Sequence, residues 1–279
     1  MRTLHAGSFR LSLDRPLIMG IVNTTPDSFS DGGHLPSVQA AIDHGFKLAE
    51  QGAHILDIGG ESTRPGAAFV PVEEEQRRVL PVIQALANAG LVVSVDTRKP
   101  EVMQAALDAG AVMVNDVMAL RAPGALDVLA ASQAAVCLMH MQGEPQTMQQ
   151  TPHYVDVVGE VAQFLRERMD LCAAAGIVPA RMVIDPGFGF GKTLAHNLAL
   201  LKNLAVLSAG EVPLMAGMSR KFMLGALTGR AVEEREFAGV AAHVLAVAHG
   251  ARLLRVHDVA AMRDALAVWN AVEETENGT

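Results

Sequence analysis

Short apolar runs alternate with stretches of helical spacing between residues 16 and 273 of the chain. The apolar runs cover 16–22, 55–58, 91–95, 112–114, 135–139, 182–184, 212–215 and 253–256. Runs of this length that end in a polar loop are typical of buried strands. Between and after them, helical spacing covers about 37–51, 72–89, 99–109, 124–132, 155–175, 194–209, 232–249 and 258–273. The pattern therefore predicts eight strand–helix units.

This alternation indicates an α/β fold with a parallel sheet, because strands separated by helices pair in parallel. Eight such units are the number that closes a (β/α)8 TIM barrel, which disfavours the alternative of an open doubly wound sheet. Residues 8–14 alternate apolar and polar positions and predict a short peripheral strand or hairpin before the barrel. No linker or low-complexity segment divides the 279 residues. We therefore expect one domain over 1–279, with the barrel core at about 16–273.

Composition narrows the class of protein further. Half of the residues are hydrophobic and only 4% are aromatic, so the core must be aliphatic. The net charge of −8 argues against nucleic acid as a partner. The long apolar run 238–248 contains His243 and is shorter than the roughly 20 residues of a membrane span. Cys137 and Cys172 lack metal-site spacing, and the first residues lack a secretory signal, so we expect free thiols and a cytoplasmic location.

Polar residues follow nearly every predicted strand at its carboxyl end, where the active site of a TIM barrel lies. In strand order they are Asn23; Glu61 to Arg64; Asp96 and Thr97; Asn115 and Asp116; His140; Asp185; Ser219 to Lys221; and Arg255 and His257. Any single one of them could be a helix cap. Eight positions at one edge of the sheet together predict a site.

The acceptors in this ring suggest one class of ligand. Asp96, Asn115 and Asp185 would present short carboxylate and amide groups, which suit a flat heterocycle with several N–H donors and a carbonyl. For Glu61, Asp116 and His140 we favour a structural role.

The donors in the ring suggest an anionic group on the ligand. They are Arg64, Lys221, Arg255 and His257. We expect Ser219 to lie at a helix start and to add backbone N–H groups. Paired cysteines and an HExxH motif are absent from the sequence, but Asn23 with Asp27 or Asp31 could hold Mg²⁺ through oxygen.

The glycine-rich stretch 182–192 reads as a buried strand that ends on Asp185, followed by a loop whose backbone can approach a ligand closely. It ends like a phosphate-binding loop at Lys192, but Pro186 stands where that motif needs glycine, so we reject a nucleoside triphosphatase. Phe188 and Phe190 could each face a ligand or plug the core.

The loops resemble those of the dihydropteroate synthases. The matching motifs are 23–33, 57–66, 96–97, 115–116, 185–190, 217–221 and 255–257, in the order of that family. The resemblance implies a (β/α)8 fold and the condensation of 6-hydroxymethyl-7,8-dihydropterin diphosphate with 4-aminobenzoate to 7,8-dihydropteroate and diphosphate, in folate synthesis. It also implies a homodimer and a subsite that sulfonamides occupy.

The resemblance further implies a role for each site residue. Those that would hold the pterin are Asp96, Asn115, Asp185 and Lys221. Those that would hold the diphosphate are Asn23, Arg255 and His257, with Mg²⁺ near Asn23. Those that would frame the aminobenzoate are Phe29, Thr63, Arg64, Pro65, Phe190 and Ser219. Phe188 keeps a core position and Lys192 has no part in the site.

The loops after the first two strands are long enough to act as lids through Asp31 and Arg64. The group expected to act in catalysis is Asn23, Asp31, Arg64, Lys221, Arg255 and His257. Two alternatives stay open: a pterin-binding methyltransferase domain that works with a corrinoid protein, and a non-catalytic paralogue.

Overall fold

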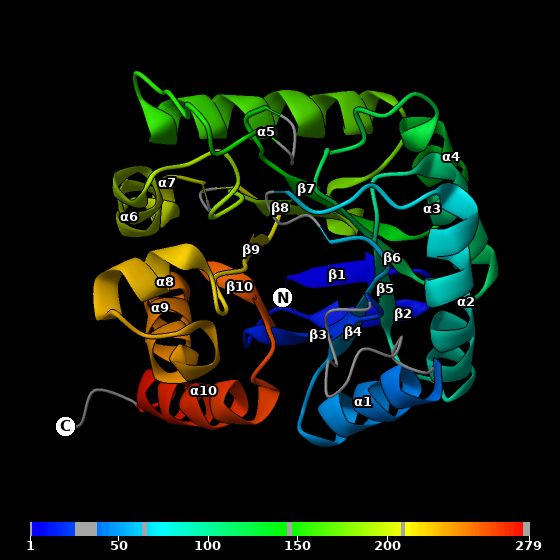
Figure 1. Ribbon diagram of the computed structural model, residues 1–279, viewed down its shortest axis with the longest axis horizontal. Helices are drawn as coiled ribbons and strands as arrows, with labels where there is room; N and C mark the ends of the chain where they lie inside the picture. The colour runs from blue at the N-terminus through cyan, green and yellow to red at the C-terminus, as the bar shows by residue number, and fades with distance from the viewer. Residues whose placement is uncertain (1, 26–37, 63–65, 144–146, 208–209, 276–279) are drawn as a thin grey trace.

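Eight parallel strands close into a barrel, as the sequence predicts (Figure 1). The computed structural model describes residues 2–25, 38–62, 66–143, 147–207 and 210–275. The barrel strands are β3 (Leu17–Asn23), β4 (Ile55–Gly59), β5 (Val93–Asp96), β6 (Met113–Asp116), β7 (Ala135–Met139), β8 (Met182–Asp185), β9 (Leu214–Ala216) and β10 (Ala251–Val256). Each pairs with its sequence neighbours, and β10 pairs with β3 to close the ring.

An outer layer of helices surrounds the strands (Figure 1). They are α1 (Val38–Glu50), α2 (Val72–Asn88), α3 (Pro100–Asp108), α4 (Ala125–Ala131), α5 (Val157–Ala174), α6 (Leu194–Lys202), α7 (Leu204–Leu207), α8 (Phe222–Thr228), α9 (Glu236–Ala248) and α10 (Val259–Glu273). Local sequence signals explain where some of these helices begin or end. Asp156 caps α5 by accepting a bond from the N–H of Val158, and Gly52 after α1 takes a left-handed φ of 108°.

Two predicted helices differ from the structure. The stretch 194–209 is split into α6 and α7 at Asn203, whose side-chain amide donates to the carbonyl of Ala199 (2.8 Å) and so competes with the helical pattern. The stretch 232–249 is helical in α9 only from Glu236, after a separate turn at Val232–Glu234. The short helix α8 lies before that turn and adds a further element to the crossover between β9 and β10.

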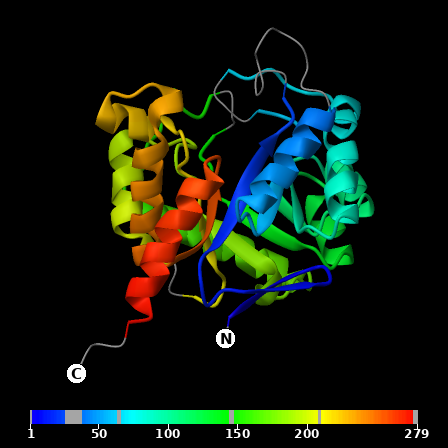
Figure 2. The same cartoon turned by 90° about the horizontal axis from the view of Figure 1, so that it is seen from below.

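The predicted peripheral segment 8–14 contains β2 (Phe9–Ser12), which pairs with β1 (Thr3–Ala6), outside the predicted range, to form a hairpin. Leu4, Ala6 and Leu13 are buried against residues inside the barrel, among them Met19 and Met113. Figure 2 shows the hairpin across the end of the barrel opposite the carboxyl ends of the strands. The interior is therefore closed at the amino end, and a ligand must enter at the carboxyl end.

A second, larger apolar cluster lies between the barrel and its helices, with β-branched and leucine side chains such as Ile58, Val95 and Leu86 fully buried. Packing on both faces explains why the strands read as continuous apolar runs. Within the described ranges, no helix is both long and apolar enough to cross a bilayer.

Candidate active site

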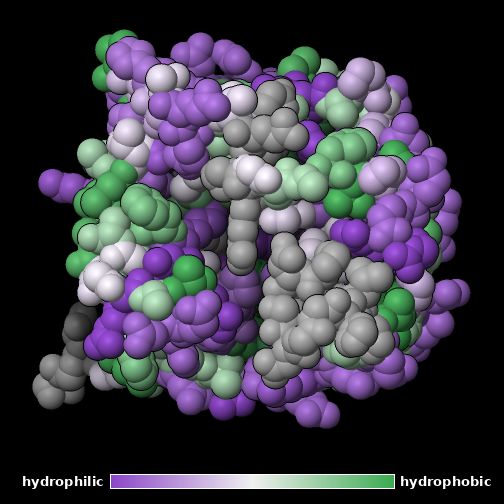
Figure 3. All heavy atoms as spheres, viewed as in Figure 1, coloured by the Kyte–Doolittle hydropathy of each residue, from purple (hydrophilic) through white to green (hydrophobic). Residues whose placement is uncertain are grey.

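Three predicted acceptors meet at the carboxyl mouth of the barrel. Asp96 pairs in register with Asn115 on the next strand, and Asp185 ends β8 two strands further on. The side chains of Asn115 and Asp185 are nearly buried, at 4% exposure each. Figure 3 shows the molecule from the carboxyl end of the barrel. The surface is hollowed near its centre, and the residues seen in the hollow are mostly hydrophilic. The structure thus brings these acceptors to one concave place.

Asp57 of β4 belongs to the same cluster, although the sequence analysis did not single it out. Its Oδ2 accepts bonds from Nδ2 of Asn115 (2.9 Å) and from Nε of Arg255 (2.6 Å). Because Asn115 donates through its amide nitrogen to Asp57, its amide oxygen keeps the capacity to accept a hydrogen bond from a ligand. The signal in the sequence was a carboxylate inside the apolar run 55–58, where an ion is rare unless it is paired.

Arg255 lies between two carboxylates. Its Nε meets Asp57 and its Nη2 meets Oδ2 of Asp96 at 2.7 Å. Arg255, the predicted anion donor, therefore pairs with two carboxylates of the mouth. Removing the guanidinium would leave two carboxylates in a buried cluster without their cation.

Asp185, Lys221 and Phe190 form the other wall of the mouth. Oδ1 of Asp185 accepts a bond from the N–H of Gly187 (2.6 Å), which leaves Oδ2 for another donor. The ammonium of Lys221 donates to the carbonyl of Phe188 and lies 4.5 Å from the ring centre of Phe190. Phe188 is fully buried, so its expected core position is confirmed, whereas Phe190 is only partly buried.

The expectation that Ser219 starts a helix is wrong. Helix α8 begins at Phe222 with Lys221 at its N-cap, and Ser219 lies in the turn before it. Arg220 between them has a left-handed φ of 59°, which turns the chain out of helical geometry. Ser219 instead bonds to His257: its Oγ accepts from the backbone N–H (3.2 Å) and lies 3.0 Å from Nδ1.

Two glycines after Asp185 lie close to the backbone of the segment after β7. A Cβ at Gly187 would lie 1.9 Å from the carbonyl oxygen of His140, and one at Gly191 would lie 2.5 Å from that of Gln142. These contacts within the protein account for the two glycines, and the predicted approach of the loop backbone to a ligand stays a prediction. The two glycines let the loop pack on the segment after β7.

Lys192 stabilises the loop that follows Asp185 through hydrogen bonds to its backbone. Its buried ammonium donates to the carbonyls of Gly187 and Phe190 (3.0 Å each) and meets Nδ1 of His140 at 2.9 Å. Burial lowers the pKa of His140 to about 3, with the charge of Lys192 acting in the same direction, and burial also lowers the pKa of Lys192 well below its usual value. The imidazole is therefore neutral, and its Nδ1 can accept a hydrogen bond from Nζ of Lys192. Lys192 and His140 thus have structural roles, as expected.

Asp116 and Glu61 also take the structural roles that we favoured. Asp116 accepts bonds from the backbone N–H groups of Met118 and Leu120 (2.7 Å each) and closes the turn after β6. Glu61 accepts from the N–H of Val70 (3.0 Å) and from Arg98 and Lys99. Both side chains are therefore used within the protein.

Five of the predicted site residues lie outside the described residues: Phe29, Asp31, Thr63, Arg64 and Pro65. Asn23 is described and ends β3, with its Oδ1 on the same side of Gly59 as Asp96. Among the described residues, no group of three or more His, Cys, Asp or Glu could hold a metal by itself. A metal at Asn23 would need oxygen ligands from the substrate or from Asp27 and Asp31.

Burial shifts the ionisation of the groups in the mouth. It raises the pKa of Asp96 to about 7, although the charge of Arg255 opposes the shift. Burial also raises the pKa of Asp185, against the charge of Lys221 and the bond from Gly187. For Lys221 it lowers the pKa to about 8, with Asp185 opposing. Acidic and basic groups whose pKa lies close to neutral pH are common in active sites.

Buried acceptors thus lie together at the carboxyl end of the barrel, with Lys221 beside the ring of Phe190. The model of the family "Pterin binding enzyme" matches residues 19–257, and the chain belongs to this family.

Three similar proteins give a narrower class. The dihydropteroate synthase of Neisseria meningitidis serogroup B is 52% identical over 275 residues and 96% of both chains. A structure of Xanthomonas albilineans dihydropteroate synthase with 4-aminobenzoic acid has a TM-score of 0.93 and 57% identity, covering 99% of each chain. A Yersinia pestis dihydropteroate synthase in a sulfonamide drug complex has a TM-score of 0.94 and 45% identity, covering 98% of this chain and 100% of that one. Within the pterin-binding enzymes, the chain is thus one of the dihydropteroate synthases, which are transferases.

Proposed function

We propose that this chain joins 6-hydroxymethyl-7,8-dihydropterin diphosphate to 4-aminobenzoate, with the pterin ring held at the bottom of the barrel mouth. The observation that carries the proposal is the constellation around one buried hollow of Asp185 at the end of β8, Asn115 on β6 and Lys221 at the N-cap of α8. Oδ2 of Asp185 and the amide oxygen of Asn115 would accept the N–H donors of the ring. The ammonium of Lys221 would donate to the ring carbonyl or nitrogen.

The bond to be broken joins the exocyclic carbon of the pterin to the diphosphate. The ring can delocalise the positive charge that develops on this carbon, so we propose a dissociative substitution. His257 and Arg255, at the end of β10, would face the leaving diphosphate. Arg255 can turn from Asp96 to the diphosphate because the pKa of Asp96 is about 7, so that this carboxylate is readily protonated. The aniline nitrogen is a neutral nucleophile, so positioning matters more than a strong base.

We also propose Mg²⁺ as the cofactor, bound through Asn23. An amide oxygen is the hard ligand that Mg²⁺ accepts, and a single protein ligand supplemented by substrate phosphates is a usual arrangement for this ion. When bound, Mg²⁺ would neutralise charge on the leaving diphosphate. Asn23 fits this use because it ends β3 and is only partly buried.

The aminobenzoate subsite is proposed to lie between Phe190 and Ser219. The ring of Phe190 is partly exposed and flanks Lys221, and Ser219, in the turn after the neighbouring strand β9, lies beside His257. The similar Xanthomonas albilineans enzyme has a structure with 4-aminobenzoic acid, and the Yersinia pestis enzyme one with a sulfonamide drug. A sulfonamide, which shares the aniline ring and an acidic group, would compete for the same place here.

Turnover is tested by mixing the protein with the pterin diphosphate, 4-aminobenzoate and Mg²⁺. We expect diphosphate release that requires 4-aminobenzoate and matches dihydropteroate formation one for one. Absence of product with folded protein would overturn the proposal and favour a non-catalytic paralogue. Transfer of a methyl group to a corrinoid protein would favour the methyltransferase alternative, although both similar structures are of synthases.

The pH profile of kcat/KM for the pterin diphosphate should be bell-shaped. Asp96 accepts N–H donors only as the carboxylate, so activity should fall as pH decreases through about 7. Lys221 donates as the ammonium, so activity should fall as pH increases through about 8. Lys221→Arg should remove the alkaline limb at reduced overall activity, because a guanidinium stays charged to a pH above about 12.

Lys202→Arg, an exposed lysine at the end of α6, is the matched control and should keep both limbs. An alkaline limb that persists near the same pH in Lys221→Arg would contradict the role given to Lys221.

We further propose a homodimer that forms through α8, α9 and α10. These helices expose large apolar side chains, with Phe237 at 84%, Phe222 at 76% and Val268 at 67% exposure. Light scattering should give the mass of two chains, and Phe237→Glu the mass of one. A parent protein with the mass of one chain at micromolar concentration would contradict the dimer.

We also propose a cytoplasmic location. The two cysteines are buried free thiols, which suits the reducing cytoplasm.

A further inference from the structure

A tight turn at 187–190, after β8, borders the active-site lysine. The N–H of Phe190 donates to the carbonyl of Gly187 (3.1 Å), which closes a four-residue turn with Phe188 and Gly189 at its centre. Gly189 has a φ of 82°, the value of the third residue in a type II turn, and this position favours glycine. The orientation of the peptide between Phe188 and Gly189 therefore decides where the carbonyl of Phe188 points.

Lys221 is bonded to this central peptide. Its ammonium donates to the carbonyl of Phe188, and within the part of the chain that the structure describes this carbonyl is the one hydrogen-bond acceptor of the ammonium. The stem of the lysine also lies against the turn, because a Cβ at Gly189 would come within 3.3 Å of its Cδ. The turn therefore sets the position of the group that would donate to the pterin ring.

Asn197 of α6 holds the other side of the same peptide. Its Oδ1 accepts from the N–H of Gly189 (2.8 Å), while its Nδ2 donates to the carbonyls of Thr193 (2.7 Å) and Lys192 (3.3 Å). The residue is only 3% exposed, and all three of these partners are backbone groups. Because the N–H and C=O of a trans peptide point in opposite directions, one peptide is held between Asn197 and Lys221.

The central peptide of such a turn can rotate while the turn stays closed. Types I and II differ by a rotation of this peptide of roughly 150–170°, with the first and fourth residues in place. Lys192 holds those two residues independently of Asn197, through the carbonyls of Gly187 and Phe190 (3.0 Å each). Loss of the Asn197 side chain would therefore change the direction of the Phe188 carbonyl more than the path of the loop.

We propose that Asn197 is a positioning residue for Lys221, which acts by holding the peptide between Phe188 and Gly189 in one orientation. The inference rests on the proposed function, since it takes Lys221 to donate to the pterin ring. The polar atoms of Asn197 are bonded to backbone groups, so its effect on the substrate passes through Lys221.

The ionisation of Lys221 gives a readout that a general loss of folded protein would not move. The bond to the carbonyl of Phe188 stabilises the ammonium, so losing this bond lowers the pKa of Lys221 further. The other titratable groups that interact with Lys221 are not altered by a change at Asn197; they are Asp96, Asp185, Lys192, His243 and Arg255.

The first test is the pH profile of Asn197→Leu. The alkaline limb of kcat/KM for the pterin diphosphate, near pH 8 in the parent, should move to lower pH by on the order of one unit, the effect of one hydrogen bond to a charged group. The acid limb, which reports Asp96, should stay where it is. Asn197→Asp keeps an acceptor for the N–H of Gly189 and should not lower the alkaline limb. An alkaline limb of Asn197→Leu at the pH of the parent would overturn the inference.

A double-mutant cycle separates positioning from stability, because leucine at 197 also leaves three backbone groups without their partner. Asn197→Leu should weaken binding of a pterin analogue on the order of tenfold in the parent, but by less than about twofold in a Lys221→Met background. Equal losses in both backgrounds would overturn the inference. If Asn197→Leu does not fold, Asn197→Ser replaces it in both tests with the same expected and contradicting results. Serine can bond to the carbonyl four residues earlier, at Thr193, but is too short to reach Gly189.

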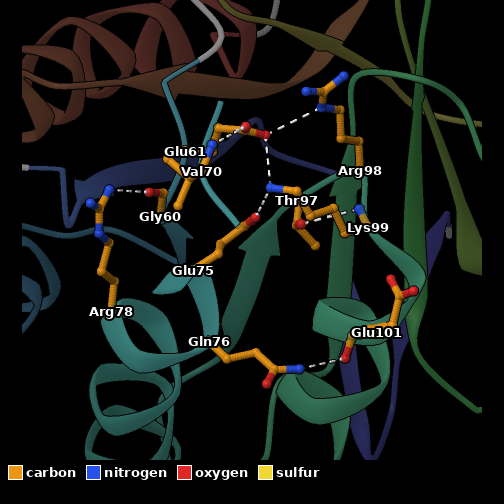
Figure 4. A network of polar contacts seen from close by, with 10 residues as sticks. All are labelled: Gly60, Glu61, Val70, Glu75, Gln76, Arg78, Thr97, Arg98, Lys99 and Glu101. Carbon is orange, nitrogen blue, oxygen red and sulfur yellow. Dashed lines mark hydrogen bonds and ion pairs between the residues drawn. The ribbon is translucent and has the colours of Figure 1, made fainter. Parts of the chain in front are cut away.

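Gln76→Leu is the matched control. The amide of Gln76 also ties a helix to the backbone of another element, since it donates from α2 to the carbonyl of Glu101 in α3 (3.0 Å; Figure 4). This variant should keep both limbs of the parent profile. A parent protein that forms no product would refute the proposed function, whereas an active parent whose alkaline limb does not respond to the change at Asn197 refutes only the positioning role.

Discussion

Replacement of Asp185 by asparagine is expected to weaken pterin binding by about a hundredfold or more, the loss of one to two hydrogen bonds to a charged acceptor. In the parent, Oδ1 accepts from Gly187 and Oδ2 is left for the ligand. Asparagine has only one acceptor oxygen, so either the bond from Gly187 is lost or an amide N–H points at the N–H donors of the pterin. Titration of the protein with a pterin analogue measures the effect.

The control for this variant is Asp170→Asn, on the exposed face of α5 and distant in sequence from every strand end. It should bind the analogue like the parent. Binding of the analogue to Asp185→Asn with the affinity of the parent would show that the ring does not contact this carboxylate, and would remove the main support for the pterin site.

Replacement of Arg255 by methionine is expected to destabilise the fold by about 3–5 kcal/mol at pH 8, the usual effect of removing one partner from a buried ion pair. Asp57 and Asp96 both depend on this guanidinium, through bonds of 2.6 and 2.7 Å. Urea unfolding measures the free energy. Arg252→Met, also on β10, is the matched control, because its side chain donates only to the carbonyl of Ala251 among the bonds described.

The pH dependence of this variant has a defined sign. Arg255 opposes the raised pKa of Asp96, so without Arg255 folding raises that pKa further and the folded state binds more protons than the unfolded chain. Stability then increases as pH decreases from about 7, where Asp96 already titrates in the parent, towards the pKa near 4 of an unfolded aspartate. The deficit should therefore be smaller at pH 5 than at pH 8. Equal stability of variant and parent at pH 8 would contradict the buried ion cluster.

The barrel could be predicted from the sequence because its signal is periodic and repeated. Eight apolar runs separated by helical stretches leave few topologies, and polar residues at the strand ends then fall together by the geometry of the fold. Asp96, Asn115 and Asp185 needed only this geometry, and the structure brings them to one hollow. The N-terminal hairpin was likewise visible as alternation, although its closure of the barrel was not.

The remaining features depend on contacts between distant residues. Asp57 gained its importance from Asn115 and Arg255, which are 58 and 198 positions away. Ser219 was expected to start a helix because serine favours that position, but the left-handed backbone of Arg220 and the bonds to His257 place it in a turn. The glycines at 187 and 191 suggested a close approach, but their partners are the carbonyls of residues 140 and 142. A glycine in the sequence indicates that the backbone comes close to another group, but it does not identify that group.

The lysines of the chain illustrate the same difference. Lys192 follows a glycine-rich loop and Lys221 follows β9. Both lysines come within a few residues of the carboxyl end of a barrel strand, so the sequence alone places both near the mouth. The structure buries Lys192 against three carbonyls and a neutral imidazole, whereas Lys221 lies beside Asp185 and Phe190. Lys99 was not singled out at all, because its partners Glu61 and Glu75 come from another loop and helix.

The most direct test of the account is a crystal structure of this protein with a pterin analogue. The account predicts electron density for the ring in the barrel mouth, with its N–H groups within hydrogen-bond distance of Oδ2 of Asp185 and the amide oxygen of Asn115. The ammonium of Lys221 should lie on the opposite edge of the ring. Density for the analogue outside the mouth, or with Asp185 bonded only to Gly187, would contradict the account.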